Sequence, residues 1–437
     1  MTWTYEAARA ALDRSVDLEK QAITAQSPVP SLDRMRELAR RLGDPQRRFP
    51  VIHLTGTNGK TSTARITAAL LGAAGRRVGL YTSPHLERVN ERLVLSGRPV
   101  DDDVFARCVG AAVDAAAPMA ERPTFFELLT AAAFGWFAES AADVAVIEVG
   151  LLGRWDATNI ADGRVAVVTS VGADHLDYAG SLDGVAQEKA GIVKPGAQLV
   201  LGEVEARFDP VFTRTPAAGI QRLGTEFAFL DGRPDPTGRR GSLRTALARY
   251  DDVLLALHGT YQEANAACAL AAVEAFVGAA LPAEVVEAGL AAVRAPGRLE
   301  IVGAAPLRVL DGAHNPAATA ALVRSLTEEF PARRWTVVYG ALRGHDFEAT
   351  LAELDGTLVD MVLCCEPASP RAIPAEQLAA AAQRLGLPAR AQPKVTTAVR
   401  QALHHAGPTG AILVTGSFYH LTEARRILSV VPRRDPT

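Results

Sequence analysis

Residues 51–63 carry the pattern that most constrains how this chain can fold. They read Val-Ile-His-Leu-Thr-Gly-Thr-Asn-Gly-Lys-Thr-Ser-Thr, a β-branched apolar run followed by two glycines, a lysine and a segment with helical spacing. This order predicts a strand, a tight turn and a helix, which together bind phosphate through backbone N–H groups at the helix start. The candidate nucleotide contacts are the residues of this turn and of the first helical turn: Thr57, Asn58, Gly59, Lys60, Thr61 and Ser62.

Two residues of this turn have chemistry that suits a nucleotide. Lys60 is placed to reach the outer phosphates, and Thr61 is placed to contact Mg²⁺. The Gly-x-x-Gly-Lys-Thr spacing is shorter than the usual Gly-x-x-x-x-Gly-Lys-Thr loop, with Leu54 at the position of the first glycine. The alternative is a plain glycine turn with a surface lysine, but strand, turn, Lys-Thr and helix in order favour the phosphate site.

The composition bounds the class of protein. A chain of 437 residues predicts two or three domains, and a net charge of -3 argues against nucleic-acid and membrane partners. The N-terminal residues lack a signal pattern, and apolar runs are too interrupted to span a bilayer. The four cysteines are Cys108, Cys268, Cys364 and Cys365, and their spacing is not that of a zinc site. They are expected to be reduced thiols in the core of a cytoplasmic protein. The protein is also expected to be a monomer.

Polar residues follow the predicted strands of the first half of the chain. Ser83 follows a strand at 77–81, Glu148 ends a strand at 143–148, and His175 follows a strand at 165–171. In an open parallel α/β sheet the carboxyl ends of the strands meet at one edge, so these residues should converge with Lys60. Glu148 suits Mg²⁺, whereas the imidazole of His175 suits softer metals. The alternatives are a carboxylate that caps a helix and a hydrogen-bonding loop histidine.

A second α/β domain is predicted after the Ala-Pro-Gly-Arg break at 295–298. Strand and helix patterns alternate again beyond it, and we place the domains at 1–296 and 297–437. The expected fold is a P-loop-containing doubly wound parallel-sheet domain followed by a smaller Rossmann-like α/β domain. Residues 207–251 are weakly patterned, and 235–241 are expected to form an exposed hairpin or loop.

Lysine is rare in this chain and arginine is common, so each lysine is informative. The lysines are Lys20, Lys60, Lys189, Lys194 and Lys394. Arginine replaces lysine easily on a solvated surface but not where chemistry needs an amine. Lys189 is therefore a candidate functional residue, although chance retention on the surface is the alternative, and the favoured one for Lys20 and Lys394.

Seven motifs occur in order between about Ser31 and about His420: Gly-Thr-Asn-Gly-Lys, Thr-Ser-Pro-His-Leu, Thr-Phe-Phe-Glu, Glu-Val-Gly-x-x-Gly-Arg-x-Asp-Ala-Thr-Asn, Asp-His-x-Asp-Tyr, Glu-Lys-Ala-Gly-Ile and Asp-Gly-Ala-His-Asn-Pro. Together they resemble the folylpolyglutamate synthase / dihydrofolate synthase family of the Mur ligase superfamily. The resemblance implies that ATP phosphorylates a carboxylate of a reduced folate or dihydropteroate and that L-glutamate attacks the acyl phosphate. The alternatives are a ligase for a cell-wall precursor and a nucleotide-switch ATPase.

The resemblance also assigns roles to residues. It implies two Mg²⁺ ions, one held by Ser83 and Glu148 and the other by Glu148 and His175, and a carbamylated Lys189 as a further metal ligand. The further matches, by expected role, are ATP contacts at Asn265, Arg298 and Asp311, the glutamate side at His314 and Ser417, and the pterin region at Thr124, Phe126, Trp155, Asp156 and Ala157.

The catalytic residues expected from the resemblance are Lys60, Lys189 and His314. Three positions depart from the family pattern. Thr61 stands where many members have glycine, which leaves open whether Thr61 or Ser62 contacts Mg²⁺. Leu152 stands where the family has glycine, and Trp155 stands where it often has leucine. Both substitutions are expected to affect the pterin pocket, which Leu152 could narrow.

Overall fold

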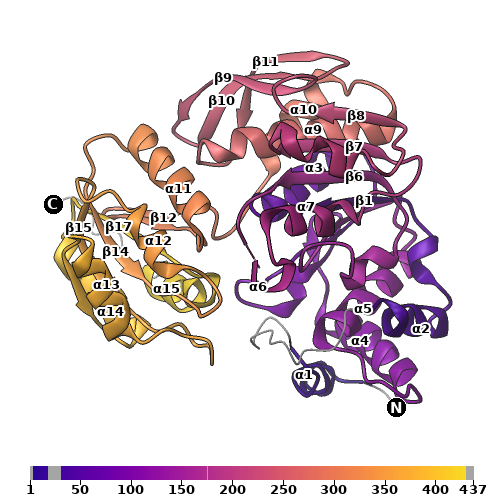
Figure 1. Cartoon of the computed structure of the whole chain (residues 1–437), viewed down its shortest axis with the longest axis horizontal. Coiled ribbons are helices and arrows are strands. Elements are labelled where there is room, and N and C mark those ends of the chain that lie inside the picture. Colours follow the sequence, from indigo (N-terminus) through magenta and orange to yellow (C-terminus); the bar gives the residue numbers. More distant parts are fainter. Residues whose placement is uncertain (1–2, 18–30, 175, 430–437) are drawn as a thin grey trace. The chain divides into compact units, whose positions relative to one another are not determined.

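The computed structural model describes residues 3–17, 31–174 and 176–429, so Lys20 and His175 lie outside the described residues. The chain forms two compact units (Figure 1). Unit 1 comprises Met1–Arg233, Arg240–Ala256 and Gln262–Val293, and unit 2 comprises Pro234–Arg239, Leu257–Tyr261 and Arg294–Thr437. Two short internal segments therefore belong to the same unit as the C-terminal third of the chain.

Unit 1 is an α/β unit built on an eight-stranded sheet of order β4-β3-β2-β5-β1-β6-β7-β8. Its strands and those of a second, three-stranded sheet (β11-β10-β9) are Val51–Thr55 (β1), Val78–Tyr81 (β2), Leu93–Leu95 (β3), Arg98–Pro99 (β4), Val144–Glu148 (β5), Gly163–Ser170 (β6), Gln198–Glu203 (β7), Gly219–Arg222 (β8), Ala228–Asp235 (β9), Gly238–Arg244 (β10) and Arg249–Leu255 (β11). The strands from β2 to β8 in this order run parallel, and β3 and β4 add an antiparallel edge.

The helices of this part of the chain are Tyr5–Asp13 (α1), Asp33–Arg41 (α2), Lys60–Ala73 (α3), Asp102–Ala116 (α4), Phe125–Glu139 (α5), Leu176–Ala179 (α6), Leu182–Ala190 (α7), Asp209–Phe212 (α8), Tyr261–Val277 (α9) and Ala283–Ala292 (α10), with short 3₁₀ segments at Pro45–Arg47, Val89–Arg92, Ala157–Ile160 and Ala206–Phe208. Helices α1, α2, α4 and α5 share one core cluster with β1, β2 and β5. Helices α3 and α10 pack on each other, and α7 and α8 cover β6 and β7.

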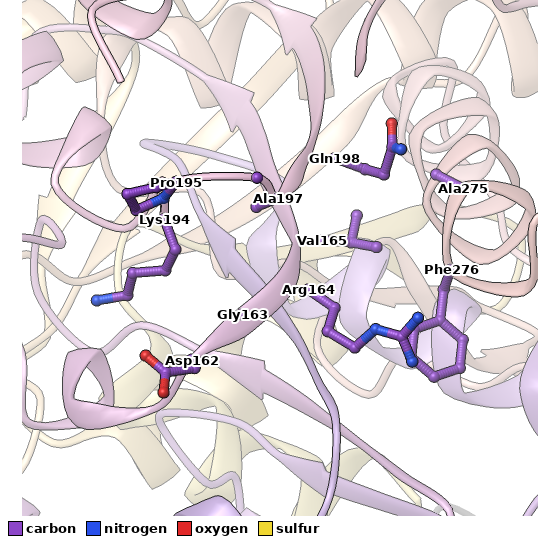
Figure 2. Close-up of a pocket in the computed structure, with 11 residues that line it drawn as sticks. Asp162, Gly163, Arg164, Val165, Lys194, Pro195, Ala197, Gln198, Ala275 and Phe276 are labelled. Carbon is purple, nitrogen blue, oxygen red and sulfur yellow. The ribbon is translucent and has the colours of Figure 1, made fainter. Parts of the chain in front are cut away.

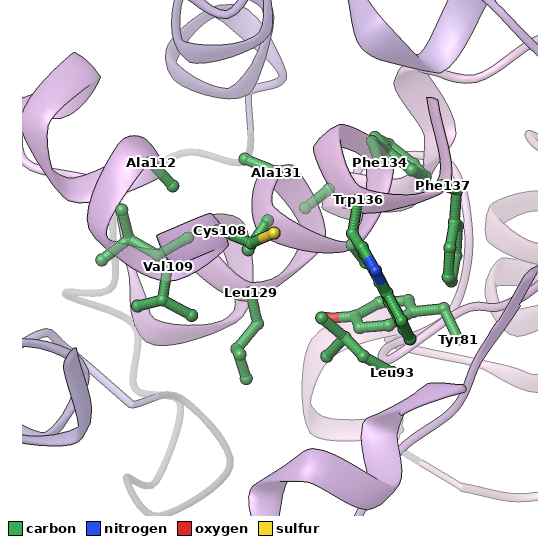
Figure 3. Close-up of a cluster of buried hydrophobic side chains, with 14 of the residues drawn as sticks. Tyr81, Leu93, Cys108, Val109, Ala112, Leu129, Ala131, Phe134, Trp136 and Phe137 are labelled. Carbon is green, nitrogen blue, oxygen red and sulfur yellow. The ribbon is translucent and has the colours of Figure 1, made fainter. Parts of the chain in front are cut away.

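Aromatic side chains of α5 fill the core beside β2 (Figure 3). Phe134, Trp136 and Phe137 are buried there with Tyr81. The α5 helix begins with a capping box: Thr124 Oγ1 accepts a hydrogen bond from the Glu127 N–H, and Glu127 Oε2 accepts one from the Thr124 N–H. This cap fixes where the helix starts, and with it the position of the neighbouring Phe126.

Unit 2 is a smaller α/β unit with a six-stranded sheet of order β12-β13-β17-β14-β15-β16. Its elements are Glu300–Ala304 (β12), Leu307–Leu310 (β13), Pro316–Glu329 (α11), Trp335–Tyr339 (β14), Phe347–Ala352 (α12), Val359–Cys364 (β15), Ala375–Arg384 (α13), Ala389–Ala391 (β16), Val395–Ala406 (α14), Ala411–Thr415 (β17), the 3₁₀ segment Phe418–His420 and Leu421–Leu428 (α15). Only β12 is antiparallel to its neighbour. Helices α11, α12 and α13 share a core cluster with one face of this sheet, and α14 packs against β14 and β17.

The weakly patterned segment 207–251 is more ordered than the sequence indicated. It forms the three-stranded sheet, with 235–241 at the connection of β9 and β10. The expectation that this connection is exposed is wrong for Gly238 and Arg239, which are buried. Arg239 is 1% exposed and forms ion pairs with Glu328 at 2.8 Å and Glu329 at 3.6 Å, all within unit 2.

Arg239→Met is expected to destabilise unit 2 by roughly 3 kcal/mol, because Glu329 is buried and would lose one of the cations that face it. Glu329 would keep only its contacts with His258 Nδ1 (2.7 Å) and the Gly259 N–H (2.6 Å) among those described here. Urea denaturation measures the change.

The neighbouring Arg240 is the matched control for this measurement. Its ion pair with Asp252 is largely exposed, so Arg240→Met should change the unfolding free energy by less than about 1 kcal/mol. Equal effects of the two substitutions would show that the buried cluster does not stabilise unit 2.

Candidate active site

The turn between β1 and α3 requires glycine at two positions. Gly56 has φ 155° and Gly59 has φ 85°, both on the positive side that favours glycine. A Cβ at Gly56 would lie 1.9 Å from Thr169 Oγ1, and a Cβ at Gly59 would lie 2.3 Å from Asn265 Oδ1. The backbone of the turn is therefore tightly packed against its neighbours, which leaves its amide groups in a defined arrangement.

Hydrogen bonds to the end of β6 hold this turn. The Thr57 N–H donates to Ser170 O at 3.0 Å, and the Asn58 N–H donates to Ser170 Oγ at 2.9 Å. The Lys60 ammonium folds back over the turn and donates to Gly56 O (2.8 Å) and Thr57 O (3.2 Å). The lysine thus lies over the turn of residues 56–59, which the sequence predicts to bind phosphate.

Asn265, from α9, supports the turn from the other side. Its Oδ1 accepts a hydrogen bond from Thr63 Oγ1 at 3.3 Å, and its Nδ2 donates to Gln262 Oε1 at 2.9 Å. Both Asn265 and Thr63 are buried. Asn265, a predicted ATP contact, therefore lies against the turn between β1 and α3, which we call the phosphate turn (residues 56–59).

Glu148 brings three of the predicted metal ligands together. It ends β5, which lies between β1 and β2, and it is 1% exposed. Its Oε1 accepts a hydrogen bond from Thr61 Oγ1 at 2.8 Å, and its Oε2 accepts one from the Ser83 N–H at 3.2 Å. Thr61, Ser83 and Glu148 therefore meet at the carboxyl edge of the sheet, as predicted, whereas His175 lies outside the described residues.

This donor set fits a hard cation. Two hydroxyl groups and one carboxylate supply oxygen atoms, which Mg²⁺ prefers, and Mg²⁺ usually takes few protein ligands beside phosphate oxygens. Within residues 3–17, 31–174 and 176–429, no three His, Cys, Asp or Glu side chains cluster closely enough to hold a metal by themselves. A site here thus depends on ligands beyond Glu148.

Lys189 lies buried in the last turn of α7, with only 3% of its surface exposed. Burial lowers its pKa well below the usual lysine value, the charge of Lys60 lowers it further, and Asp174 opposes the shift. The ammonium form of Lys189 is thus disfavoured relative to the neutral amine. The influence of Lys60 also shows that the two lysines of interest lie in one electrostatic neighbourhood.

The loop after β5 packs on the turn that carries Lys189. The Arg154 N–H donates to Glu188 O at 2.8 Å, and a Cβ at Gly153 would lie 2.8 Å from the same oxygen. Asn159 Nδ2 donates to Gly191 O at 3.0 Å, just after α7. The predicted pterin loop and the predicted carbamate site are therefore joined by backbone contacts.

The predicted pterin residues fall into two groups. Phe126 packs beside Tyr81, with ring centroids 5.7 Å apart, and a Cβ at Gly150 would lie 2.6 Å from Phe126 Cζ. Trp155 is 44% exposed, a large apolar side chain available for contact. Asp156, in contrast, is buried and holds its own loop; burial raises its pKa to about 6, while hydrogen bonds from the loop oppose the rise.

The other two predicted pterin residues lie at or beside α5, and their pterin role stays a prediction. Thr124 caps α5, and Ala157 is buried in the core cluster of α5.

Leu152 has a positive φ, a backbone conformation that favours glycine, which is the residue at this position in the family pattern. Its φ is 57°, and its side chain is buried in the core cluster of β6, β7, α7 and α8. Phe126 packs against a different cluster. The leucine side chain therefore packs in the core cluster of β6, β7, α7 and α8, and its expected effect on the pterin pocket stays a prediction.

Asp311, a predicted ATP contact in unit 2, is held by several hydrogen bonds. This buried carboxylate accepts hydrogen bonds from Tyr261 Oη (2.7 Å) and from the N–H groups of Leu299 (2.8 Å) and Ala313 (2.8 Å). Burial raises the pKa of Asp311, and Arg298 opposes the rise. The Arg298 guanidinium lies over the Phe418 ring, 4.8 Å from its centroid.

His314 and Ser417 lie in the loops that follow β13 and β17. The Nδ1 of His314 is 2.8 Å from Gly312 O, and its ring lies edge-on to His345, with centroids 4.9 Å apart. Ser417 Oγ accepts a hydrogen bond from the Tyr419 N–H at 3.2 Å. The ATP and glutamate roles of the residues in unit 2 stay predictions.

Sequence reasoning missed Tyr261, His345 and Phe418, which contact predicted residues. His345 and Phe418 follow predicted strands. The reasoning that singled out residues at the carboxyl ends of parallel strands could therefore have found them. Tyr261 begins α9 and carried no such signal.

A cavity of about 410 Å³ lies at the opposite edge of the unit 1 sheet (Figure 2). It is lined by residues at the start of β6 and β7, including Arg164 and Gln198, together with Lys194 and Phe276. Arg164 extends along Phe276, 5.3 Å from the ring centroid, while Lys194 points away from it toward Asp162. No predicted site residue lines this cavity, and its cations do not converge.

Comparison with known proteins assigns the family. Residues 54–206 match the Mur ligase middle domain, and residues 297–418 match the Mur ligase glutamate ligase domain. The chain is 40% identical over 383 residues to a dihydrofolate synthase/folylpolyglutamate synthase from Mycobacterium tuberculosis, covering 82% of this chain and 78% of the relative. The chain belongs to the folylpolyglutamate and dihydrofolate synthase family of Mur ligases.

Solved structures of this family share the whole fold. A Mycobacterium tuberculosis folylpolyglutamate synthase complexed with ADP superposes with a TM-score of 0.90 at 37% identity, covering 98% of this chain and 99% of that one. Escherichia coli FolC in complex with DHPP and ADP gives 0.85 at 30% identity, covering 97% of each chain. The predicted family, α/β fold class and ligase activity are confirmed, and the folate–glutamate ligase is favoured over the two alternatives.

Within the part of the chain that the structure describes, no helix is both long enough and apolar enough to cross a bilayer. The four cysteines are free and buried, as expected.

Proposed function

We propose that this folylpolyglutamate synthase family member uses ATP to join L-glutamate to a reduced folate and also converts dihydropteroate to dihydrofolate. The observation that carries the proposal is the meeting of Thr61, Ser83 and Glu148 beside the phosphate turn. Relatives named for both activities support the wider substrate range, among them a Bacillus subtilis protein 32% identical over 415 residues.

The proposed reaction has two steps, formation of an acyl phosphate and attack on it by the glutamate amine. A carboxylate oxygen of the pteroyl substrate attacks the γ-phosphorus of ATP, ADP leaves, and an acyl phosphate forms. The glutamate amine then attacks the acyl carbon, and inorganic phosphate leaves with the former carboxylate oxygen while the amine loses a proton. Lys60, which lies over the backbone of the turn, stabilises the negative charge that develops on the transferred phosphoryl group.

Two Mg²⁺ ions are proposed to bind here, where they would neutralise the negative charge of the phosphates and of the substrate carboxylate. The chain would supply Thr61, Ser83 and Glu148, and the predicted ligands His175 and Lys189 complete the set. Glu148 is held by the Thr61 hydroxyl and the Ser83 N–H, so its carboxylate is already oriented toward the turn.

Lys189 is proposed to be carbamylated. A lysine amine attacks carbon dioxide only in its neutral form, and burial beside the charge of Lys60 favours that form. The new C–N bond forms as the amine loses a proton, and the product is an anionic oxygen donor. Arginine cannot form it, which accounts for lysine in a chain where arginine is the common base.

The remaining assignments extend the proposal to the other ligands. Asn265, Arg298 and Asp311 are proposed to contact ATP, and His314 and Ser417 to contact glutamate. Phe126 and Trp155 offer aromatic faces for the pterin. A monomeric state, a cytoplasmic location and the lack of nucleic-acid and membrane partners stay predictions.

A substrate panel with purified protein tests the function. ADP formation should require both a pteroyl substrate and glutamate, and the product should gain one glutamyl residue by mass. A cell-wall precursor that replaces the pteroyl substrate, or ADP formation that needs neither co-substrate, would contradict the proposal.

A further inference from the structure

A buried histidine lies beneath the loop proposed to contact the pterin. His53 is the third residue of β1, and its side chain is fully buried. Its Nε2 lies 2.9 Å from Thr158 Oγ1, and Thr158 Oγ1 in turn lies 2.5 Å from Asp156 Oδ1. The three side chains form a line from the central strand of the sheet to the carboxylate that holds the loop.

The proton positions in this line follow from the chemistry of its members. The Thr158 hydroxyl has one proton, and it donates that proton to the Asp156 carboxylate in the short, charge-assisted bond. The hydroxyl oxygen is then an acceptor, so His53 Nε2 must carry a proton and donate it. Burial and the charge of Lys194 lower the pKa of His53 to about 3, so the ring is neutral and its Nδ1 is unprotonated.

The far end of the line fixes the loop itself. Asp156 Oδ2 accepts a hydrogen bond from the Leu151 N–H at 2.9 Å, and Oδ1 accepts one from the Thr158 N–H at 2.9 Å. The carboxylate thereby joins the two ends of a segment that carries Trp155. Its orientation sets the path of residues 151–157.

A histidine at this position has an energetic disadvantage. In the described parts of the chain, His53 Nδ1 finds no hydrogen-bond partner although it is buried. A buried polar atom without a partner loses its hydrogen bonds to water and gains none in return, so an aliphatic residue would stabilise the strand better. The presence of histidine at this position is explained if its Nε2 donates a hydrogen bond to Thr158, which an aliphatic side chain cannot do.

We propose that His53 is a positioning residue for the pteroyl substrate, which acts through Thr158 and Asp156 on the loop of residues 151–157. The inference rests on the proposed function, because it takes this loop as the pterin contact. His53 does not touch the substrate; it supplies the one donor that lets Thr158 give its own proton to Asp156.

The test compares variants that remove the donor with one that keeps it. His53→Leu and Thr158→Val break the line, whereas His53→Gln retains a side-chain N–H. The first two should each raise KM for dihydropteroate about tenfold and leave the affinity for ADP unchanged, because one buried hydrogen bond is lost far from the nucleotide. His53→Gln should restore most of the affinity, and combining His53→Leu with Thr158→Val should add little to either change.

Val51→Ala is the matched control for a general loss of packing. Val51 lies on the same face of β1, is fully buried, and takes no part in the hydrogen bonds. This variant should lower the thermal midpoint without raising KM for dihydropteroate.

Hydrogen exchange separates this inference from the proposed function. Amides of residues 151–157 should exchange faster in His53→Leu and in Thr158→Val than in the wild-type protein, even without substrate. If the wild-type protein used no pteroyl substrate, the proposed function would fail while this measurement still reported on the loop. Unchanged exchange, a wild-type KM in folded His53→Leu, or a parallel loss of ADP affinity would overturn the positioning role.

Discussion

Lys60→Ala is expected to abolish glutamate ligation while the protein stays folded. The ammonium makes hydrogen bonds only to the turn carbonyls of Gly56 and Thr57 among the described contacts, and the side chain is partly exposed. Their loss should change the unfolding free energy by about 1 kcal/mol. Removing a cation that faces the transferred phosphoryl group should lower kcat by at least about a hundredfold.

Steady-state kinetics with saturating ATP, pteroyl substrate and glutamate measure the loss, and circular dichroism checks the fold. Lys394→Ala is the matched control, because Lys394 is exposed and lies in unit 2 at the start of α14. It should keep wild-type turnover. Near-normal turnover by folded Lys60→Ala would refute the phosphate-turn assignment.

Lys189→Arg is expected to be as damaging as Lys189→Ala, although arginine is a basic residue of similar length. Both should lower kcat by about a hundredfold, since neither can supply the carbamate oxygen to the metal site. Arginine would also place a permanent charge where burial and Lys60 already disfavour one. A lysine that only paired with a carboxylate would tolerate arginine.

Rescue experiments sharpen this second prediction. Short carboxylic acids should partly restore Lys189→Ala by filling the ligand position, and they should not restore Lys189→Arg. Lys194→Arg is the matched control: Lys194 is a partly buried lysine whose pKa is also lowered, but it donates to Asn159 O (3.0 Å) and Oδ1 (2.9 Å). Arginine can make such bonds, so activity should persist. Wild-type activity of Lys189→Arg would contradict the carbamate.

The central strands and their polar ends could be predicted because their signals are local. Residues 51–55 and 143–148 are short apolar runs bounded by polar loops, and both are parallel strands of the sheet. The convergence of Thr61, Ser83 and Glu148 then follows from parallel topology alone. The cap of α5 was also readable, because Thr124 and Glu127 stand at the spacing of a capping box.

What the sequence did not reveal depends on long-range contacts. Arg239 lies in a polar, turn-rich segment that the sequence predicts to be exposed. It is nevertheless buried, and it forms ion pairs with Glu328 and Glu329, which are far from it in the sequence. His53 reads as one residue of an apolar strand, and nothing nearby in the chain indicates Thr158 as its partner. The strands β3, β4 and β8, at the two ends of the sheet order, were missed because they are only two to four residues long, too short to show a periodic apolar pattern.

Transfer of a heavy oxygen isotope tests the acyl-phosphate reaction most directly. The pteroyl substrate is labelled in the carboxylate that accepts glutamate, and the inorganic phosphate released during ligation is analysed by mass spectrometry. The proposed reaction predicts that one labelled oxygen appears in each phosphate formed, in step with the amide product. Phosphate that carries no label, released while ADP and the glutamyl product accumulate, would contradict attack by the carboxylate on ATP.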